Sequence, residues 1–109
     1  MAKRESICKK YLCYHRWFPE KEKFGITNQI RRASLSITAN IAEGFARSTK
    51  VEKARFLNIS YSSCIEVINF LILCLDLKFL NEDEYQKLRS NAEKISNQLI
   101  ALHKSVNAK

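Results

Sequence analysis

The chain has 109 residues, the size of one ordinary domain, and its 46% apolar and 28% charged residues exclude a disordered chain. It contains only two glycines and one proline, and since β-rich folds need many turns, this composition favours a few long helices. Residues 1–55 hold 13 basic and 5 acidic residues, whereas the remainder is balanced, so the net charge of +8 lies in the first half. This asymmetry suggests an anionic partner, and a merely soluble basic surface is the alternative.

The sequence predicts neither a membrane span nor a secretory signal. No apolar run of 18 or more residues occurs, and no apolar stretch follows the charged start of the chain. We therefore expect a cytoplasmic location and reduced thiols, with Cys64 and Cys74 in the core, although a disulfide framework is conceivable. The spacing of Cys8, Cys13 and His15 matches no common zinc pattern, so neither a metal nor a cofactor is expected.

The first two predicted helices span residues 3–17 and 22–44. The first is short, with a single apolar stripe, and Pro19 is expected to end it because proline disfavours a helical residue before it. The second is expected to end near Gly44, which is a plausible C-terminal cap. Their apolar stripes consist of Ile7, Tyr11, Tyr14 and Phe18, and of Ile26, Ile30, Ala33, Ile37 and Ile41.

The third and fourth predicted helices span residues 50–77 and 82–106, and a capping box marks the start of each. The boxes pair Thr49 with Glu52 and Asn81 with Glu84. In the fourth helix one stripe follows 3-4 spacing: Tyr85, Leu88, Ala92, Ile95, Leu99, Leu102 and Val106. The third helix is apolar almost all round over residues 64–77, which predicts a second burial partner such as another subunit.

Short connections at about 18–21, 45–49 and 78–81 force neighbouring helices to run antiparallel. We therefore expect an all-α fold: one domain over residues 1–109, an up-down-up-down four-helix bundle.

No catalytic constellation is visible in the sequence. It contains no glycine-rich phosphate loop and no HExxH motif, and His15 and His103 are far apart. We therefore expect a binding protein and not an enzyme.

Basic residues are the candidate nucleic-acid contacts, since arginine and lysine pair with phosphates. The first choice is one group: Arg31, Arg32, Arg47, Lys50, Lys53 and Arg55. A second group comprises Lys9, Lys10 and Arg16, near aromatic residues that would stack on bases if exposed. A solvated helix face with core aromatics is the alternative. The i,i+4 pair of Glu43 and Arg47, together with Asn40 and Gly44, is interpreted as fixing the turn after the second helix.

The segments FGITNQIRRA at residues 24–33 and SITANIAEGF at residues 36–45 resemble the signature of the 23S rRNA intervening-sequence proteins. The resemblance extends over roughly residues 11–106. It implies a four-helix bundle that assembles into a homopentamer. It also implies kinship with the accessory variability proteins of diversity-generating retroelements, basic pentamers that bind a reverse transcriptase and its RNA. Thr38 replaces the family's usual proline, and the first helix is shorter than is usual in the family.

These observations predict a homo-oligomeric accessory protein that binds RNA or DNA, in particular structured RNA or a complex of RNA with a reverse transcriptase. The alternative is a structural or protein-interaction module whose basic charge serves a protein partner.

Overall fold

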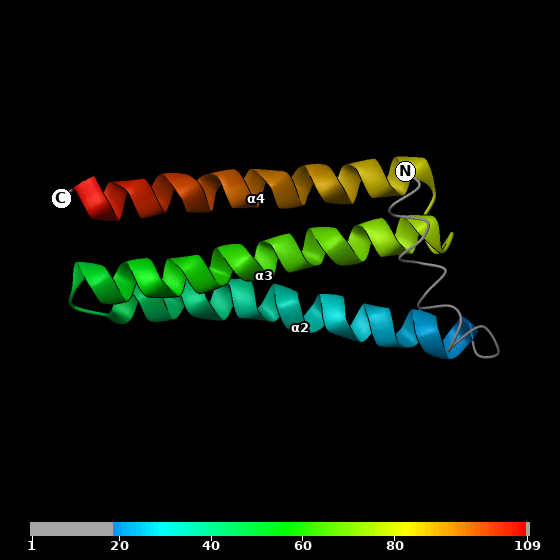
Figure 1. Cartoon of the computed structure of the whole chain (residues 1–109), viewed down its shortest axis with the longest axis horizontal. Coiled ribbons are helices and arrows are strands. Elements are labelled where there is room, and N and C mark those ends of the chain that lie inside the picture. Colours follow the sequence, from blue (N-terminus) through cyan, green and yellow to red (C-terminus); the bar gives the residue numbers. More distant parts are fainter. Residues whose placement is uncertain (1–18, 109) are drawn as a thin grey trace.

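Three long antiparallel helices make up the part of the chain, residues 19–108, that the computed structural model describes (Figure 1). They are α2 (Pro19–Ala46), α3 (Lys50–Asp76) and α4 (Glu82–Ala108). All regular structure in these residues is helical, which confirms the all-α class. The helix predicted over residues 3–17 lies outside the described residues.

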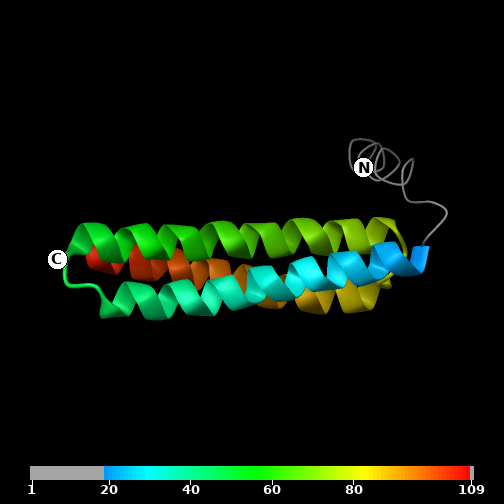
Figure 2. The same ribbon diagram turned by 90° about the horizontal axis from the view of Figure 1, so that it is seen from below.

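The central helix is α3, which packs against both α2 and α4. Figure 2 shows that the three axes do not lie in one plane, because α2 and α4 are both displaced to the same side of α3. By length and composition α3 would be able to cross a membrane. The core helix of a water-soluble bundle has the same properties, and here α3 carries much of the described core.

Pro19 is the first residue of α2. The end of the helix predicted before it lies outside the described residues. Proline is favoured at the first helical position, since its missing N–H is one that the first turn leaves unpaired anyway. The predicted connection at 18–21 and the predicted start at residue 22 are therefore wrong, and α2 begins three residues earlier.

The interpretation of Gly44 as a C-terminal cap is also wrong. Gly44 is buried inside α2, which continues to Ala46, and none of the described glycines has a positive φ. A Cβ at this position would lie 3.3 Å from the Phe56 Cβ and 3.4 Å from the Lys53 carbonyl oxygen. The glycine is needed because α2 and α3 approach closely here, and the link between them is only residues 47–49.

The predicted capping residues begin α3 and α4. The Asn81 side chain accepts from the Glu84 N–H at 2.8 Å, and the Glu84 carboxylate accepts from the Asn81 N–H at 2.9 Å, so this capping box is complete. At α3 the Thr49 hydroxyl accepts from the Glu52 N–H at 3.2 Å. Within the described residues the Glu52 carboxylate forms no return bond, so the second box is half formed.

A Schellman motif ends α3. The Phe79 N–H donates to the Cys74 carbonyl at 2.8 Å and the Lys78 N–H to the Leu75 carbonyl at 3.1 Å. Lys78 has a φ of 64°, a conformation that usually selects glycine. The sequence did not predict this cap, because a lysine occupies the position where the motif normally has glycine.

The core lies along the inner faces of the three helices and contains most of the residues predicted for it. On α4 the heptad row of Tyr85, Ala92 and Leu99 is buried against α3. The alternate positions of the same predicted stripe are different: Leu88 is 44% and Ile95 37% exposed. The stripe therefore splits into a row that is buried against α3 and a row whose first two residues are half exposed at the edge of the contact.

Small polar side chains hold α2 against α3, which the hydrophobic pattern did not predict. The Ser60 hydroxyl, fully buried, donates to the Ile37 carbonyl at 2.9 Å. The Ser36 and Ser63 hydroxyls are hydrogen-bonded at 2.8 Å, and the Asn40 amide donates to the Ser36 hydroxyl at 3.0 Å. These bonds fix the register of the two helices, because a shift would leave buried hydroxyls unpaired.

Cys64 and Cys74 are free, buried thiols, as predicted. The Cys64 thiol donates to the Ala92 carbonyl at 3.1 Å, which links α3 to α4. Burial raises the pKa of both thiols, and the nearby Lys23 ammonium partly opposes the rise of the Cys74 pKa.

Candidate nucleic-acid interface

The structure divides the six first-choice basic residues into two groups. Arg47, Lys50, Lys53 and Arg55 surround the turn between α2 and α3, which we call the α2–α3 corner. Arg31 and Arg32 lie near the middle of α2, roughly 22 Å away along the helix axis at 1.5 Å per residue. Lys9, Lys10 and Arg16, with the neighbouring aromatics Tyr11, Tyr14 and Trp17, lie outside the described residues.

At the α2–α3 corner, Arg47 is held within the molecule. Its guanidinium donates to the Glu43 carboxylate at 2.7 Å, which confirms the predicted i,i+4 pair. The same guanidinium lies 4.9 Å from the centre of the Phe56 ring. The Phe56 Cβ lies against Gly44, so the arginine packs on a side chain at the close contact between the two helices.

The other basic residues of the corner have internal partners too, with the exception of Lys50, for which the described residues offer none. Arg55 lies 3.7 Å from the Glu52 carboxylate and 5.7 Å from the centre of the Phe56 ring. The Lys53 ammonium donates to the Phe45 carbonyl at 3.3 Å, where it helps to satisfy the end of α2. Much of the charge at the corner is therefore engaged inside the protein.

The middle of α2 is different, because its positive charge is not compensated. Arg31 and Arg32 are exposed, and within residues 19–108 they form no ion pair. Between Lys23 and Ala42 the helix contains no acidic residue. Between Lys23 and Ala42, α2 therefore offers a phosphate two guanidinium groups without ion pairs to the described residues, and no carboxylate of its own.

Large apolar side chains lie on the outward side of α2. The sequence analysis did not predict them as exposed residues. Phe24 is 69%, Leu35 63% and Phe45 61% exposed. The signal was available in the sequence, since these residues fall off the stripe of Ile26, Ile30, Ala33 and Ile37 that faces the core. Phe24 lies two turns before Arg31 and offers a base a ring on which to stack.

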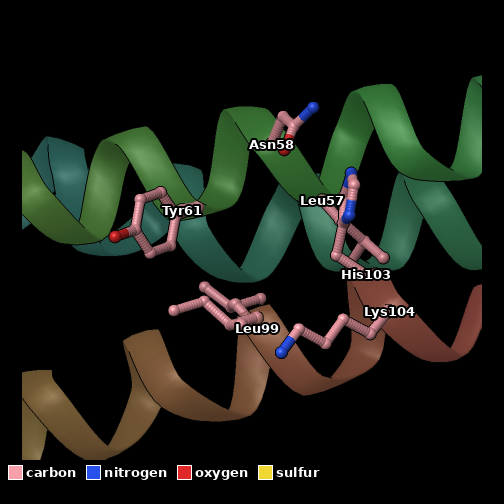
Figure 3. A pocket seen from close by; sticks show the side chains of 7 residues that line it. Leu57, Asn58, Tyr61, Leu99, His103 and Lys104 are labelled. Carbon is pink, nitrogen blue, oxygen red and sulfur yellow. The ribbon is translucent and has the colours of Figure 1, made fainter.

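A shallow hollow of about 220 Å³ between α3 and α4 contains the only histidine of the described residues (Figure 3). In the close-up the His103 ring lies beside Leu57, and the Lys104 chain extends past Leu99. His103 is hydrogen-bonded to the Asn107 amide at 3.1 Å, and within residues 19–108 no hydroxyl or thiol that would act as a nucleophile is bonded to it. Among the same residues no group of three histidine, cysteine or acidic side chains is placed to hold a metal ion.

The candidate site is therefore a basic, partly apolar surface on an all-helical scaffold. The sequence matches the family model for 23S rRNA-intervening sequence proteins over residues 2–101. The chain belongs to this family. None of the curated proteins compared with the sequence matches it.

A solved structure supports the fold. A protein of unknown function from the S23 ribosomal protein family of Bacteroides thetaiotaomicron superposes with a TM-score of 0.72 at 22% sequence identity. The match covers 94% of this chain and 96% of the other. The helical arrangement is therefore similar in the two proteins.

Proposed function

We propose that this chain is a non-catalytic, cytoplasmic, homo-oligomeric accessory protein that binds nucleic acid through the outer face of α2. The expected ligand is structured RNA, or RNA in complex with a reverse transcriptase, as the family resemblance implies. Arg31 and Arg32 are the principal phosphate contacts, and Lys50 and its neighbours at the α2–α3 corner are secondary ones.

The observation that carries the proposal is the uncompensated charge in the middle of α2. Two adjacent, exposed arginines lie in a segment without acidic residues, so within the described residues their charge is not neutralised by ion pairs. Nucleic-acid affinity comes largely from neutralised phosphates and released counterions, and such arginines supply this directly.

The assembly we propose is a four-helix bundle that forms a homopentamer, the number implied by the family resemblance. The half-exposed Leu88 and Ile95 on α4 leave a place for the helix predicted over residues 3–17. Ile59 and Ile65 on α3 are 38% and 44% exposed, which leaves apolar surface for a neighbouring subunit. Sedimentation equilibrium tests the assembly, and a clean monomer of 12.7 kDa would contradict it.

The binding site is tested by replacing Arg31 and Arg32 together with glutamine and measuring affinity for a structured RNA across a salt series. Two lost phosphate contacts reduce the slope of log K against log salt by about 1.4 to 1.8. The matched control replaces Arg47 and Arg55, which removes equal charge from groups already paired with carboxylates. We expect the control to change the slope by less than half as much.

Two results would contradict the proposal. If the wild type binds neither RNA nor DNA at low salt, the protein-interaction module becomes the better interpretation. If the Arg47 and Arg55 control loses more affinity than the Arg31 and Arg32 variant, the nucleic-acid site lies at the α2–α3 corner.

A further inference from the structure

In Figure 1, α2 and α4 end where α3 begins. An apolar hollow lies at this end of the molecule. Its volume is about 340 Å³, and all three helices contribute to it. The buried Leu57 and Gly44 form its base, and Phe45, Leu102 and Val106 supply further apolar surface. Phe45 is 61% exposed although it lies beside this apolar surface.

The helix predicted over residues 3–17 is too short to fill this hollow. At 1.5 Å per residue it would extend about 22 Å, whereas the 28 residues of α2 extend about 42 Å. A helix of that length antiparallel to α2 and starting from Pro19 would pass Leu88, which lies near the same end as Pro19, and would reach Ile95 at the middle of α4. It would be too short to reach Leu102 and Val106.

The charged residues around the hollow indicate which kind of ligand would bind there. Lys50 and Lys53 line it, and none of the described residues that line it is acidic. Lys50 is exposed and has no ion-pair partner within the described residues. An occupant with acidic side chains above an apolar face therefore matches both the lysines and the apolar surface.

We propose that this hollow, together with the adjoining surface near the ends of α2 and α4, binds an acidic amphipathic helix of a partner protein. The remaining length, about 20 Å, accommodates nearly four helical turns, or about 14 residues. A helix is the element expected because the site continues the line along which a fourth helix of the bundle would pack. Leucine-like side chains of the partner would contact Phe45, Leu102 and Val106, and its carboxylates would reach Lys50.

The hollow is separate from the principal nucleic-acid contacts proposed above. Arg31 and Arg32 do not line it, and Phe45 is more than a dozen residues further along the chain. Lys50 belongs to both proposals, as a secondary phosphate contact and as part of the hollow, so Phe45 and the pair of Arg31 and Arg32 are the residues that distinguish them.

The test uses the full chain and a fluorescein-labelled peptide of about 14 residues, with leucine at i, i+3, i+4 and i+7 and alanine and glutamate elsewhere. A matched peptide has lysine in place of glutamate. We expect the acidic peptide to bind at low ionic strength, as measured by fluorescence anisotropy, and the lysine peptide to bind at least about tenfold more weakly. If the acidic peptide does not bind, or if both peptides bind equally, the proposal is wrong.

Two pairs of variants locate the peptide. Phe45→Ala should weaken binding about tenfold, whereas Phe24→Ala, the same change at an exposed phenylalanine of α2, should leave it unchanged. Lys50→Glu should weaken binding, and Lys87→Glu on α4 serves as its control. Helical circular dichroism verifies that each variant is folded, which is expected because all four side chains are exposed.

Two further measurements distinguish peptide binding in the hollow from binding on the nucleic-acid face and from contact between subunits. The variant with Arg31 and Arg32 replaced by glutamine should bind the peptide with wild-type affinity, and a loss there would place the peptide on the nucleic-acid face. Phe45→Ala should leave the sedimentation coefficient unchanged. A shift to a smaller species would show that a second copy of the chain occupies the hollow, and would overturn the proposal.

Discussion

The two halves of α2 contain the same kinds of residue in opposite roles. In the first half a Cβ added at Gly25 would meet nothing within 4 Å, and Arg31 and Arg32 are exposed without ion pairs to the described residues. In the second half Gly44 lies against Phe56, and just past the helix end Arg47 is bound to Glu43. The role of each residue is set by whether α3 lies within reach of it, and not by its type.

The difference has a physical cause in the way the two helices meet. Short side chains, Gly44 together with Ser36 and Ser60, let α2 approach α3 closely along the second half. Charges beside such a contact gain partners and are partly desolvated, so they contribute to stability. Charges on a face with no neighbouring helix keep their hydration and remain available for a ligand.

The largest expected effect is at the two glycines. Gly44→Leu should destabilise the protein by about 2–3 kcal/mol, because the new side chain would collide with Phe56 and the Lys53 carbonyl. The same change at Gly25 should stabilise it by about 0.5–1 kcal/mol, since leucine is a better helix former than glycine and the space is open. Urea unfolding measures the stability of both variants. Equal effects at the two positions would contradict the proposed difference between the two halves of α2.

The next largest difference in stability is expected between the two pairs of arginines. Replacing Arg47 and Arg55 with glutamine should cost about 1–2 kcal/mol, since two exposed ion pairs and two contacts with the Phe56 ring are lost. Replacing Arg31 and Arg32 should change the free energy of unfolding by no more than about 0.5 kcal/mol. A larger loss at Arg31 and Arg32 would mean that these arginines have structural partners, and the proposal for α2 would lose its basis.

Two asparagines, one in each half of α2, allow the same comparison with uncharged side chains, and smaller changes in stability are expected. Asn40→Ala should cost about 1 kcal/mol, because its amide donates to the Ser36 hydroxyl and carbonyl beside the α2–α3 contact. Asn28→Ala, on the exposed side of the first half, should stabilise the helix by a few tenths of a kcal/mol. Thermal unfolding of the two variants side by side tests this, and a loss at Asn28 would indicate a contact on the outer face.

The smallest expected effect is on the pH dependence of the free energy of unfolding. It concerns Lys23, which lies in the first half of α2. Burial raises the pKa of the Cys74 thiol above its ordinary value of 9.0, while the Lys23 ammonium works against that rise. The folded protein therefore keeps a proton that the unfolded chain releases, so this stability is complete below about pH 9 and decreases as the pH rises above it. Lys23→Gln should make the decrease steeper, as measured by urea midpoints between neutral and alkaline pH. An unchanged slope would show that the ammonium does not influence the thiol.

Much of the fold was predictable from the sequence because it depends on local periodicity. The 3-4 spacing located α3 and α4 nearly to the residue, and Asn81 and Glu84 marked the start of α4 through bonds made within one turn. The arginines and lysines of the candidate site were identified in the same way, as residues off the apolar stripes. Glu43 and Arg47 were paired correctly, since an i,i+4 contact needs only the helix itself.

Only the tertiary structure decided which of these residues hold the fold and which remain free. The sequence alone placed Arg31 and Arg47 in one group, and it made Gly44 a helix cap. The roles of Gly44 and Arg47 depend on how closely α2 approaches α3, which no local pattern encodes, because Phe56 on α3 contacts both positions. The same holds for Leu88 and Ile95, whose periodicity matches that of the buried row on α4. Their exposure follows from where α3 lies, because a helix buries only the part of its apolar stripe that a neighbour covers.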